Sequence, residues 1–173
     1  HGQYPVDLFV HSLTKYASGH GDVMGGAIVA DRALLAKMRG DANVIGAALD
    51  PHAAFLIQRG LRTYFVRYET QCRTAQRLAE FLERHPAVQS VCYPGLASHP
   101  RHALARAQMR DFGTIVALDL QGGGDAAARF VDALELFASV ASLGSTESMV
   151  IPARLQSQSH LSPAERVWAA MNP

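Results

Sequence analysis

Apolar and polar positions alternate in blocks along the first third of the chain, as they do where strands and helices follow one another. Two short apolar runs, residues 7–11 and 26–30, predict buried strands. Residues 31–40 predict a short helix, because the segment begins with an acidic residue and ends in basic residues and a glycine, the polarity that a helix dipole favours. A further helix with a terminal turn is predicted over residues 53–63.

The rest of the chain has a second alternation of strand and helix patterns. Residues 68–84 predict a long amphipathic helix, with apolar side chains at helical spacing and a stop at His85 and Pro86. Residues 88–93 alternate as a half-buried strand that ends at Pro94 and Gly95. The elements predicted after it are a helix over 100–109, a strand over 112–120, a helix over 125–136 beyond a glycine triplet, and a strand over 137–143.

This β-α-β-α-β order predicts a small α/β domain, distinct from the segment before it. We place the boundary near Arg67, so that residues 1–66 form one part of the protein and residues 67–173 the other.

Composition and charge narrow the class of protein. The chain has 173 residues, of which 49% are hydrophobic and 18% charged, as in ordinary soluble globular proteins. The formal net charge of +1 lacks the excess of basic residues that nucleic-acid binding requires. No apolar run approaches the roughly 20 residues of a membrane span, and the first residues do not resemble a signal peptide. We therefore expect a cytoplasmic protein. We expect neither a membrane nor a nucleic acid as its partner. Cys72 and Cys92 are expected to be reduced thiols without a functional role.

The segment from His11 to Gly26 holds the candidate chemistry. Lys15 follows the first predicted strand and precedes a run of glycines. An amine forms a Schiff base with pyridoxal phosphate only in its neutral form, which desolvation at the edge of a buried strand favours, so Lys15 is the candidate nucleophile. The hydroxyls of Ser12 and Thr14 can bind phosphate oxygens, while the glycines permit close backbone approach.

The pattern S-x-T-K-Y-x-x-G-H-x-D-x-x-G-G over residues 12–26 resembles the cofactor-lysine segment of the Cys/Met-metabolism (trans-sulfuration) family of pyridoxal phosphate enzymes. This family includes cystathionine γ-synthases, cystathionine lyases, methionine γ-lyases and homoserine-ester sulfhydrylases. The resemblance continues in F-L-I-Q-R-G-L-R-T at 55–63, Y-P-G-L at 93–96 and S-L-G-x-x-E-S at 142–148. It therefore covers nearly the whole chain.

The resemblance also implies roles for single residues. It implies that Ser142 lies near the substrate carboxylate, as the serine of S-L-G does in the family. Tyr16 and Asp22 match motif positions and are expected only to shape the lysine loop. Arg59 and Arg62 could contact a ligand, but ordinary charges at a helix end explain them at least as well.

The family resemblance implies an α/β fold of the aspartate aminotransferase-like type (fold type I). Residues 1–66 would then be the C-terminal part of the large cofactor-binding domain, and residues 67–173 the small C-terminal domain, truncated at its end. Family members are more than twice this length. The sequence has no match for three family features: the aromatic residue that stacks on the cofactor ring, the aspartate that pairs with its pyridinium nitrogen, and the R-L-S-x-G-x-E element. We therefore expect the chain to be part of a longer enzyme.

The activity implied is that of a pyridoxal phosphate-dependent carbon–sulfur lyase or γ-replacement enzyme that acts on a small-molecule sulfur amino acid through Lys15. Ala141 stands where cystathionine-specific members commonly have glutamate, which favours a methionine γ-lyase-like or sulfhydrylase-like substrate. Cystathionine γ-synthase activity remains an alternative, as does a non-catalytic α/β module. The resemblance further implies a homo-oligomeric parent enzyme, a dimer or tetramer.

Two of the histidines have a spacing found in metal sites. His99 and His102 have a spacing compatible with two ligands on one helix face, but no carboxylate or cysteine joins them at ligand spacing, so no metal site is expected. His20 is expected to hold the turn of the lysine segment, and His11 to be a core histidine.

Overall fold

The computed structural model describes residues 5–152, 162 and 165. The chain divides into two compact units. The first is His1–Phe65 together with Leu143–Thr146, and the second is Val66–Ser142 together with Glu147–Pro173. The assignment of residues 1–66 and 67–173 to a large and a small domain stays a prediction.

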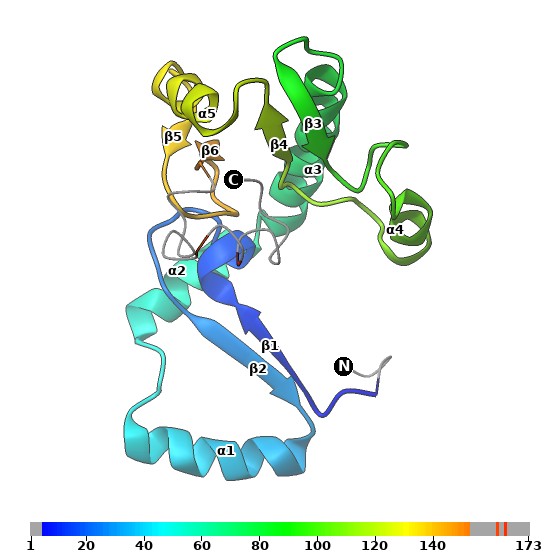
Figure 1. Ribbon diagram of the computed structural model, residues 1–173. Helices are drawn as coiled ribbons and strands as arrows, with labels where there is room; N and C mark the ends of the chain where they lie inside the picture. The colour runs from blue at the N-terminus through cyan, green and yellow to red at the C-terminus, as the bar shows by residue number, and fades with distance from the viewer. Residues whose placement is uncertain (1–4, 153–161, 163–164, 166–173) are drawn as a thin grey trace. The chain divides into compact units, whose positions relative to one another are not determined.

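The first unit is built on an antiparallel pair of strands. β1 (Leu8–Ser12) pairs with β2 (Gly26–Ala30) in a register that places Val10 opposite Ile28 (Figure 1). A short π-helical turn, η1 (Leu13–Ala17), leaves the end of β1. Both strands lie within a residue of their predicted positions, and the chain between them is the lysine loop.

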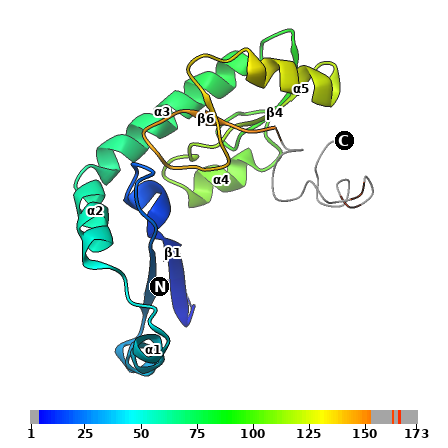
Figure 2. The same ribbon diagram turned by 90° about the vertical axis from the view of Figure 1, so that its left-hand side faces the viewer.

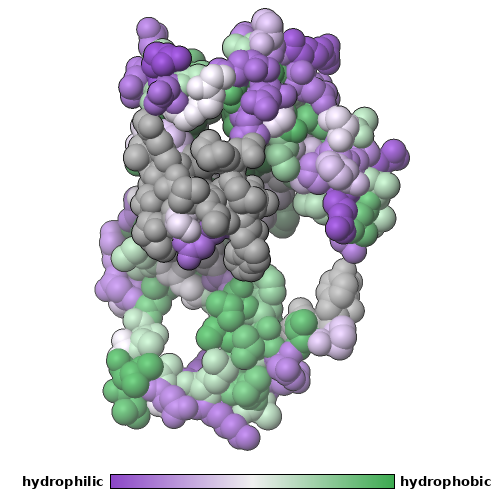
Figure 3. All heavy atoms as spheres, viewed as in Figure 1, coloured by the Kyte–Doolittle hydropathy of each residue, from purple (hydrophilic) through white to green (hydrophobic). Residues whose placement is uncertain are grey.

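The prediction that these strands are buried is wrong for most of their residues. Phe9 and Val10 of β1 are 48% and 64% exposed, and Ile28 and Val29 of β2 are 44% and 46% exposed. Figure 3 shows apolar residues gathered over this ladder. The runs are apolar on both faces, which requires a cover on both faces. Two strands present too small a surface to hide each other's side chains, and the other described elements leave these positions open to solvent.

Two helices complete the first unit. α1 (Arg32–Ile45) begins after Asp31 and ends at Gly46, whose φ of +74° is the left-handed geometry of a helix end. The predicted stop at Gly40 is wrong because Gly40 keeps helical geometry within α1, and a glycine ends a helix only when it leaves that geometry. α2 (Pro51–Leu61) begins two residues before its predicted start, with the Asp50 carboxylate accepting from the N–H groups of His52 and Ala53 at 2.9 and 3.0 Å.

The second unit packs a long helix against an antiparallel pair of strands. α3 (Tyr64–Leu82) contributes Ala75 and Ala79 to a core that also holds Tyr93 and Leu96, and Figure 2 shows its length. β3 (Val88–Cys92) and β4 (Ala117–Leu120) form an antiparallel pair, and Val91 packs on this core. The long helix and the strand predicted after it are therefore confirmed, with α3 starting four residues earlier than expected.

The later elements are shorter than predicted. α4 (His102–Gln108) lies inside its predicted range, but β4 is only the last part of the predicted strand. α5 (Gly123–Asp132) begins inside the glycine triplet, because Gly122 has a φ of +94° and precedes the first helical residue. The strand predicted over 137–143 is reduced to β5 (Ala138–Ser139), which pairs in parallel with the unanticipated β6 (Met149–Val150). Among the described residues, no helix is long and apolar enough to cross a membrane.

Candidate active site

The lysine loop is closed by backbone hydrogen bonds at its base. The N–H groups of Leu13 and Thr14 both donate to the carbonyl of Gly25, at 2.9 and 3.2 Å. Ser12, the last residue of β1, is exposed, and Lys15 is half-buried. Lys15 departs from helical geometry, with φ −89° and ψ −126°, inside the π-helical turn. Such turns occur frequently at functional sites.

Thr14 ties the two ends of the loop together. Its Oγ1 accepts from the Gly25 N–H at 2.9 Å and lies 3.2 Å from the Gly25 carbonyl, to which it donates. This closing function was not predicted from the sequence. The predicted binding of phosphate by Ser12 and Thr14 stays a prediction.

Ser18 holds the loop from within. It is 1% exposed, and its Oγ lies 2.9 Å from the Thr14 carbonyl and 3.3 Å from the Lys15 carbonyl, as a donor to both. The N–H of Gly19 also donates to the Lys15 carbonyl, at 2.8 Å. A buried hydroxyl that satisfies backbone carbonyls fixes their direction, because leaving them unpaired would cost about 1–3 kcal/mol each. The backbone that carries Lys15 is thus fixed by its own loop.

Helix α2 braces the same loop. A Cβ on Gly60 would stand 2.1 Å from the Ser18 carbonyl oxygen, so only glycine permits this approach. The Arg59 guanidinium donates to the Asp22 carboxylate at 2.8 Å, across a partly exposed ion pair. The sequence left two interpretations of Arg59 open, and the structure gives this arginine a partner within the protein. Asp22 shapes the loop as expected.

Ser142 is exposed, and its N–H donates to the Val140 carbonyl at 3.1 Å. The residues directly after it, Leu143–Thr146, belong to the first unit with the lysine loop. The role of Ser142 near a substrate carboxylate stays a prediction.

The histidines have local hydrogen-bonding partners. The Nδ1 atom of His20 lies 2.6 Å from the Ser18 carbonyl, as the expected role in the turn requires. The Nδ1 of His102 lies 2.8 Å from the Pro94 carbonyl, and the Nδ1 of His99 accepts from the Arg101 N–H at 3.2 Å. His11 is half-buried and stacks on Phe9, with 5.7 Å between ring centroids. No group of three potential metal ligands occurs in the described part of the chain.

Cys72 is buried and Cys92 exposed, and neither forms a disulfide. Burial raises the pKa of the Cys72 thiol, which disfavours the reactive thiolate.

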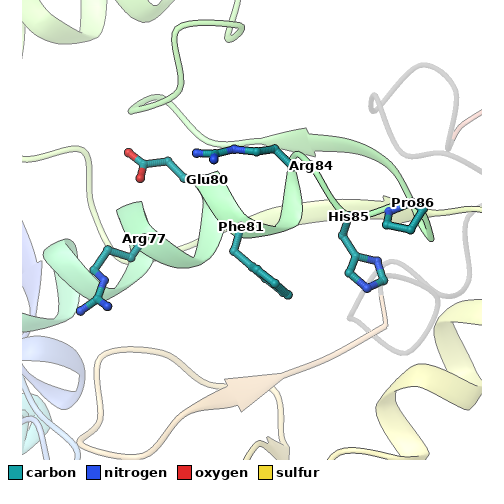
Figure 4. Close-up of a pocket in the computed structure, with 6 residues that line it drawn as sticks. All are labelled: Arg77, Glu80, Phe81, Arg84, His85 and Pro86. Carbon is teal, nitrogen blue, oxygen red and sulfur yellow. The ribbon is translucent and has the colours of Figure 1, made fainter.

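A surface hollow of about 380 Å³ lies at the end of α3. Its lining residues are Arg77, Glu80, Phe81, Arg84, His85 and Pro86. Figure 4 shows the Phe81 and His85 rings on the same side of the helix, with 5.8 Å between their centroids. None of the predicted site residues lines this hollow.

The donors of the lysine loop fit pyridoxal phosphate chemically. Lys15 offers a primary amine for an aldehyde carbon, and Ser12 offers an exposed hydroxyl for a phosphate oxygen. The sequence contains two lysines, and the other, Lys37, is exposed on α1. Of the two, Lys15 is therefore the half-buried lysine, and it lies next to the Ser12 and Thr14 hydroxyls in the chain.

Comparison with known proteins agrees with this chemistry. Residues 3–173 match the family described as Cys/Met metabolism PLP-dependent enzyme. The chain is 46% identical over 163 residues to the L-methionine gamma-lyase of Pseudomonas putida, across 93% of this chain and 41% of that protein. It is 43% identical over 162 residues to cystathionine gamma-synthase 1, chloroplastic, of Arabidopsis thaliana, across 94% of this chain and 29% of that protein.

A solved structure has a similar fold. The cystathionine gamma synthase from Xanthomonas oryzae pv. oryzae, in complex with aminoacrylate and cysteine, superposes with a TM-score of 0.91 at 39% identity, across 98% of this chain and 44% of that one. The chain thus spans about two fifths of the length of the Pseudomonas relative. The predicted fold class is confirmed as part of a fold-type I architecture. The chain belongs to the Cys/Met-metabolism family of pyridoxal phosphate-dependent enzymes.

Proposed function

We propose that the protein containing this chain is a pyridoxal phosphate-dependent carbon–sulfur lyase of the methionine or cystathionine γ-lyase type, with Lys15 as the residue that binds the cofactor covalently. The observation that carries the proposal is the held geometry of Lys15: its carbonyl accepts from the Gly19 N–H at 2.8 Å and from Ser18 Oγ at 3.3 Å. A fixed backbone limits the directions that the amine can take, and such preorganisation favours reaction at one carbon.

Each polar residue of the site has a separate role in this proposal. Ser12 binds the phosphate through its exposed hydroxyl, and Thr14 is the second phosphate contact, for which its O–H proton turns from the Gly25 carbonyl to a phosphate oxygen while its Oγ1 still accepts from the Gly25 N–H. The bound cofactor supplies an electron sink for a carbanion at the substrate α-carbon. Once displaced by the substrate amine, the Lys15 amine stays within reach of that carbon and removes its proton as a general base. Ser142 binds the substrate carboxylate.

The substrate is a small sulfur amino acid. Ala141, next to Ser142, provides no negative charge for the distal ammonium of cystathionine. This supports a methionine-like substrate. The alternative is a γ-replacement enzyme, since the chain is also similar to the synthase of Arabidopsis thaliana at 43% identity. In either case we propose a homo-oligomeric enzyme.

An absorbance titration tests the cofactor assignment. The protein is titrated with pyridoxal phosphate, and we expect a near-visible band of bound cofactor in the wild type and in Lys37→Ala. The band should be lost in Lys15→Ala. Lys37→Ala is the matched control, since it removes the other primary amine side chain from an exposed helix position. A band that survives Lys15→Ala would contradict the proposal.

A product assay then separates lyase from replacement activity. The whole protein that contains this chain is given methionine or cystathionine. Lyase activity releases a 2-oxo acid and, from methionine, a volatile thiol. Turnover only when a second thiol is supplied would favour the replacement enzyme, and no turnover under either condition would favour the non-catalytic module.

A further inference from the structure

The segment Leu143–Thr146 lies against the lysine loop, although more than 110 residues separate them in the sequence. The Thr146 N–H donates to the Gly19 carbonyl at 3.0 Å. A Cβ on Gly21 would lie 3.8 Å from the Ser145 Oγ, which is ordinary van der Waals contact. These contacts dock the segment on the loop from its Thr146 end.

Gly144 lies directly against the lysine loop. It is buried and has a φ of +80°, a conformation that side-chain-bearing residues rarely adopt. A Cβ at this position would stand 2.6 Å from the Tyr16 backbone nitrogen and 3.0 Å from the Lys15 carbonyl carbon. The Lys15–Tyr16 peptide therefore occupies the space that a side chain at position 144 would need.

The Lys15 peptide is also held from the Ser18 side. Ser18 donates to the Lys15 carbonyl, and the backbone of Ser18 rests against Gly60 of α2. Loss of the Gly144 contact would thus release one of the supports of the peptide that carries the amine.

We propose that Gly144 is a positioning residue for Lys15: its missing side chain lets Leu143–Thr146 pack on the Lys15–Tyr16 peptide and hold it. This inference rests on the proposed function of Lys15.

Gly144→Ala tests the inference, with Gly46→Ala as the matched control. Gly46 has a φ of +74°, and a Cβ there would meet nothing within 4 Å, so it shares the backbone strain without the overlap. The first readout is amide hydrogen exchange without cofactor. In Gly144→Ala we expect the Gly19 and Thr146 amides to exchange at least about tenfold faster, and in Gly46→Ala we expect no change at these positions.

The second readout is the rate at which pyridoxal phosphate labels Lys15, trapped by hydride reduction and located by peptide mass. We expect labelling to slow at least about tenfold in Gly144→Ala and to stay at the wild-type rate in Gly46→Ala. A structural role remote from Lys15 would leave this rate unchanged in folded protein.

The outcomes separate this inference from the proposed function. If the wild type is not labelled at Lys15, the proposed function fails and the inference fails with it. If the wild type is labelled and Gly144→Ala is labelled as fast, only the inference fails. Should Gly144→Ala not fold, exchange in the wild type decides: docking requires the Thr146 amide to be as protected as that of Gly19, and a freely exchanging Thr146 amide overturns it.

Discussion

Gly60 and Gly40 form a matched pair of helical glycines for testing how α2 supports the lysine loop. A Cβ on Gly60 would stand 2.1 Å from the Ser18 carbonyl oxygen, whereas a Cβ on Gly40 of α1 would meet nothing within 4 Å. Replacement of glycine by alanine within a helix ordinarily stabilises a protein by about 0.5–1 kcal/mol. This gain is common to both variants, so their difference isolates the steric contact with Ser18.

The expected difference follows from the cost of overpacking. Inserting a methyl group into a filled site costs about 1–3 kcal/mol, and the upper end applies here because the opposing atoms are backbone and cannot rotate away. Gly40→Ala should therefore raise the free energy of unfolding by about 0.5–1 kcal/mol, and Gly60→Ala should fall below Gly40→Ala by roughly 2–3 kcal/mol. Urea denaturation followed by far-ultraviolet circular dichroism measures both. Equal stabilisation by the two substitutions would refute the close packing of α2 on Ser18.

Two further predictions concern local energetics. Asp50→Ala removes both hydrogen bonds that begin α2 and should lower the free energy of unfolding by about 1 kcal/mol. Asp31 precedes α1 without a side-chain cap hydrogen bond, so Asp31→Ala should change the free energy of unfolding by less than about 0.5 kcal/mol. Urea denaturation measures both variants. Burial raises the pKa of Tyr93 to about 12. The unfolded tyrosine has a pKa of about 10, so the folded state binds more protons between about pH 10 and 12 and stability falls as the pH rises through that window. Tyr93→Phe should flatten this fall when unfolding is measured against pH, and an unchanged slope would show that Tyr93 is not its source.

The sequence predicted most elements because local signals agree with the final structure in those segments. The helical spacing of apolar residues is such a signal for α3, in which Ala75 and Ala79 are buried in the core. The ends of helices were less predictable, because a glycine can either lie inside a helix or end it. Gly40 is an interior residue of α1, and Gly46 is the end, because only Gly46 adopts a positive φ. That choice depends on backbone geometry, which residue type alone does not specify.

The same distinction applies to the site. Lys15 was found from its neighbours in the chain, since the motif that surrounds it is contiguous. The supports of its backbone were missed, because Ser18, Gly60 and Gly144 act through contacts that form only in the folded chain. Gly60 and Gly144 both stand inside recognised motifs, so a glycine fixed within a motif was the available signal for close packing. Burial of β1 and β2 was mispredicted because an apolar run indicates the need for a cover and not its presence.

The central claim is that the Lys15 amine is the covalent attachment point of pyridoxal phosphate. Its most direct test is hydride reduction of the protein after incubation with the cofactor, followed by proteolysis and mass analysis of the peptides that contain Lys15 and Lys37. The account predicts a reduced phosphopyridoxyl group on the Lys15 peptide, at a cofactor concentration that leaves the Lys37 peptide unmodified. Equal modification of both lysines, or modification of Lys37 alone, would contradict it.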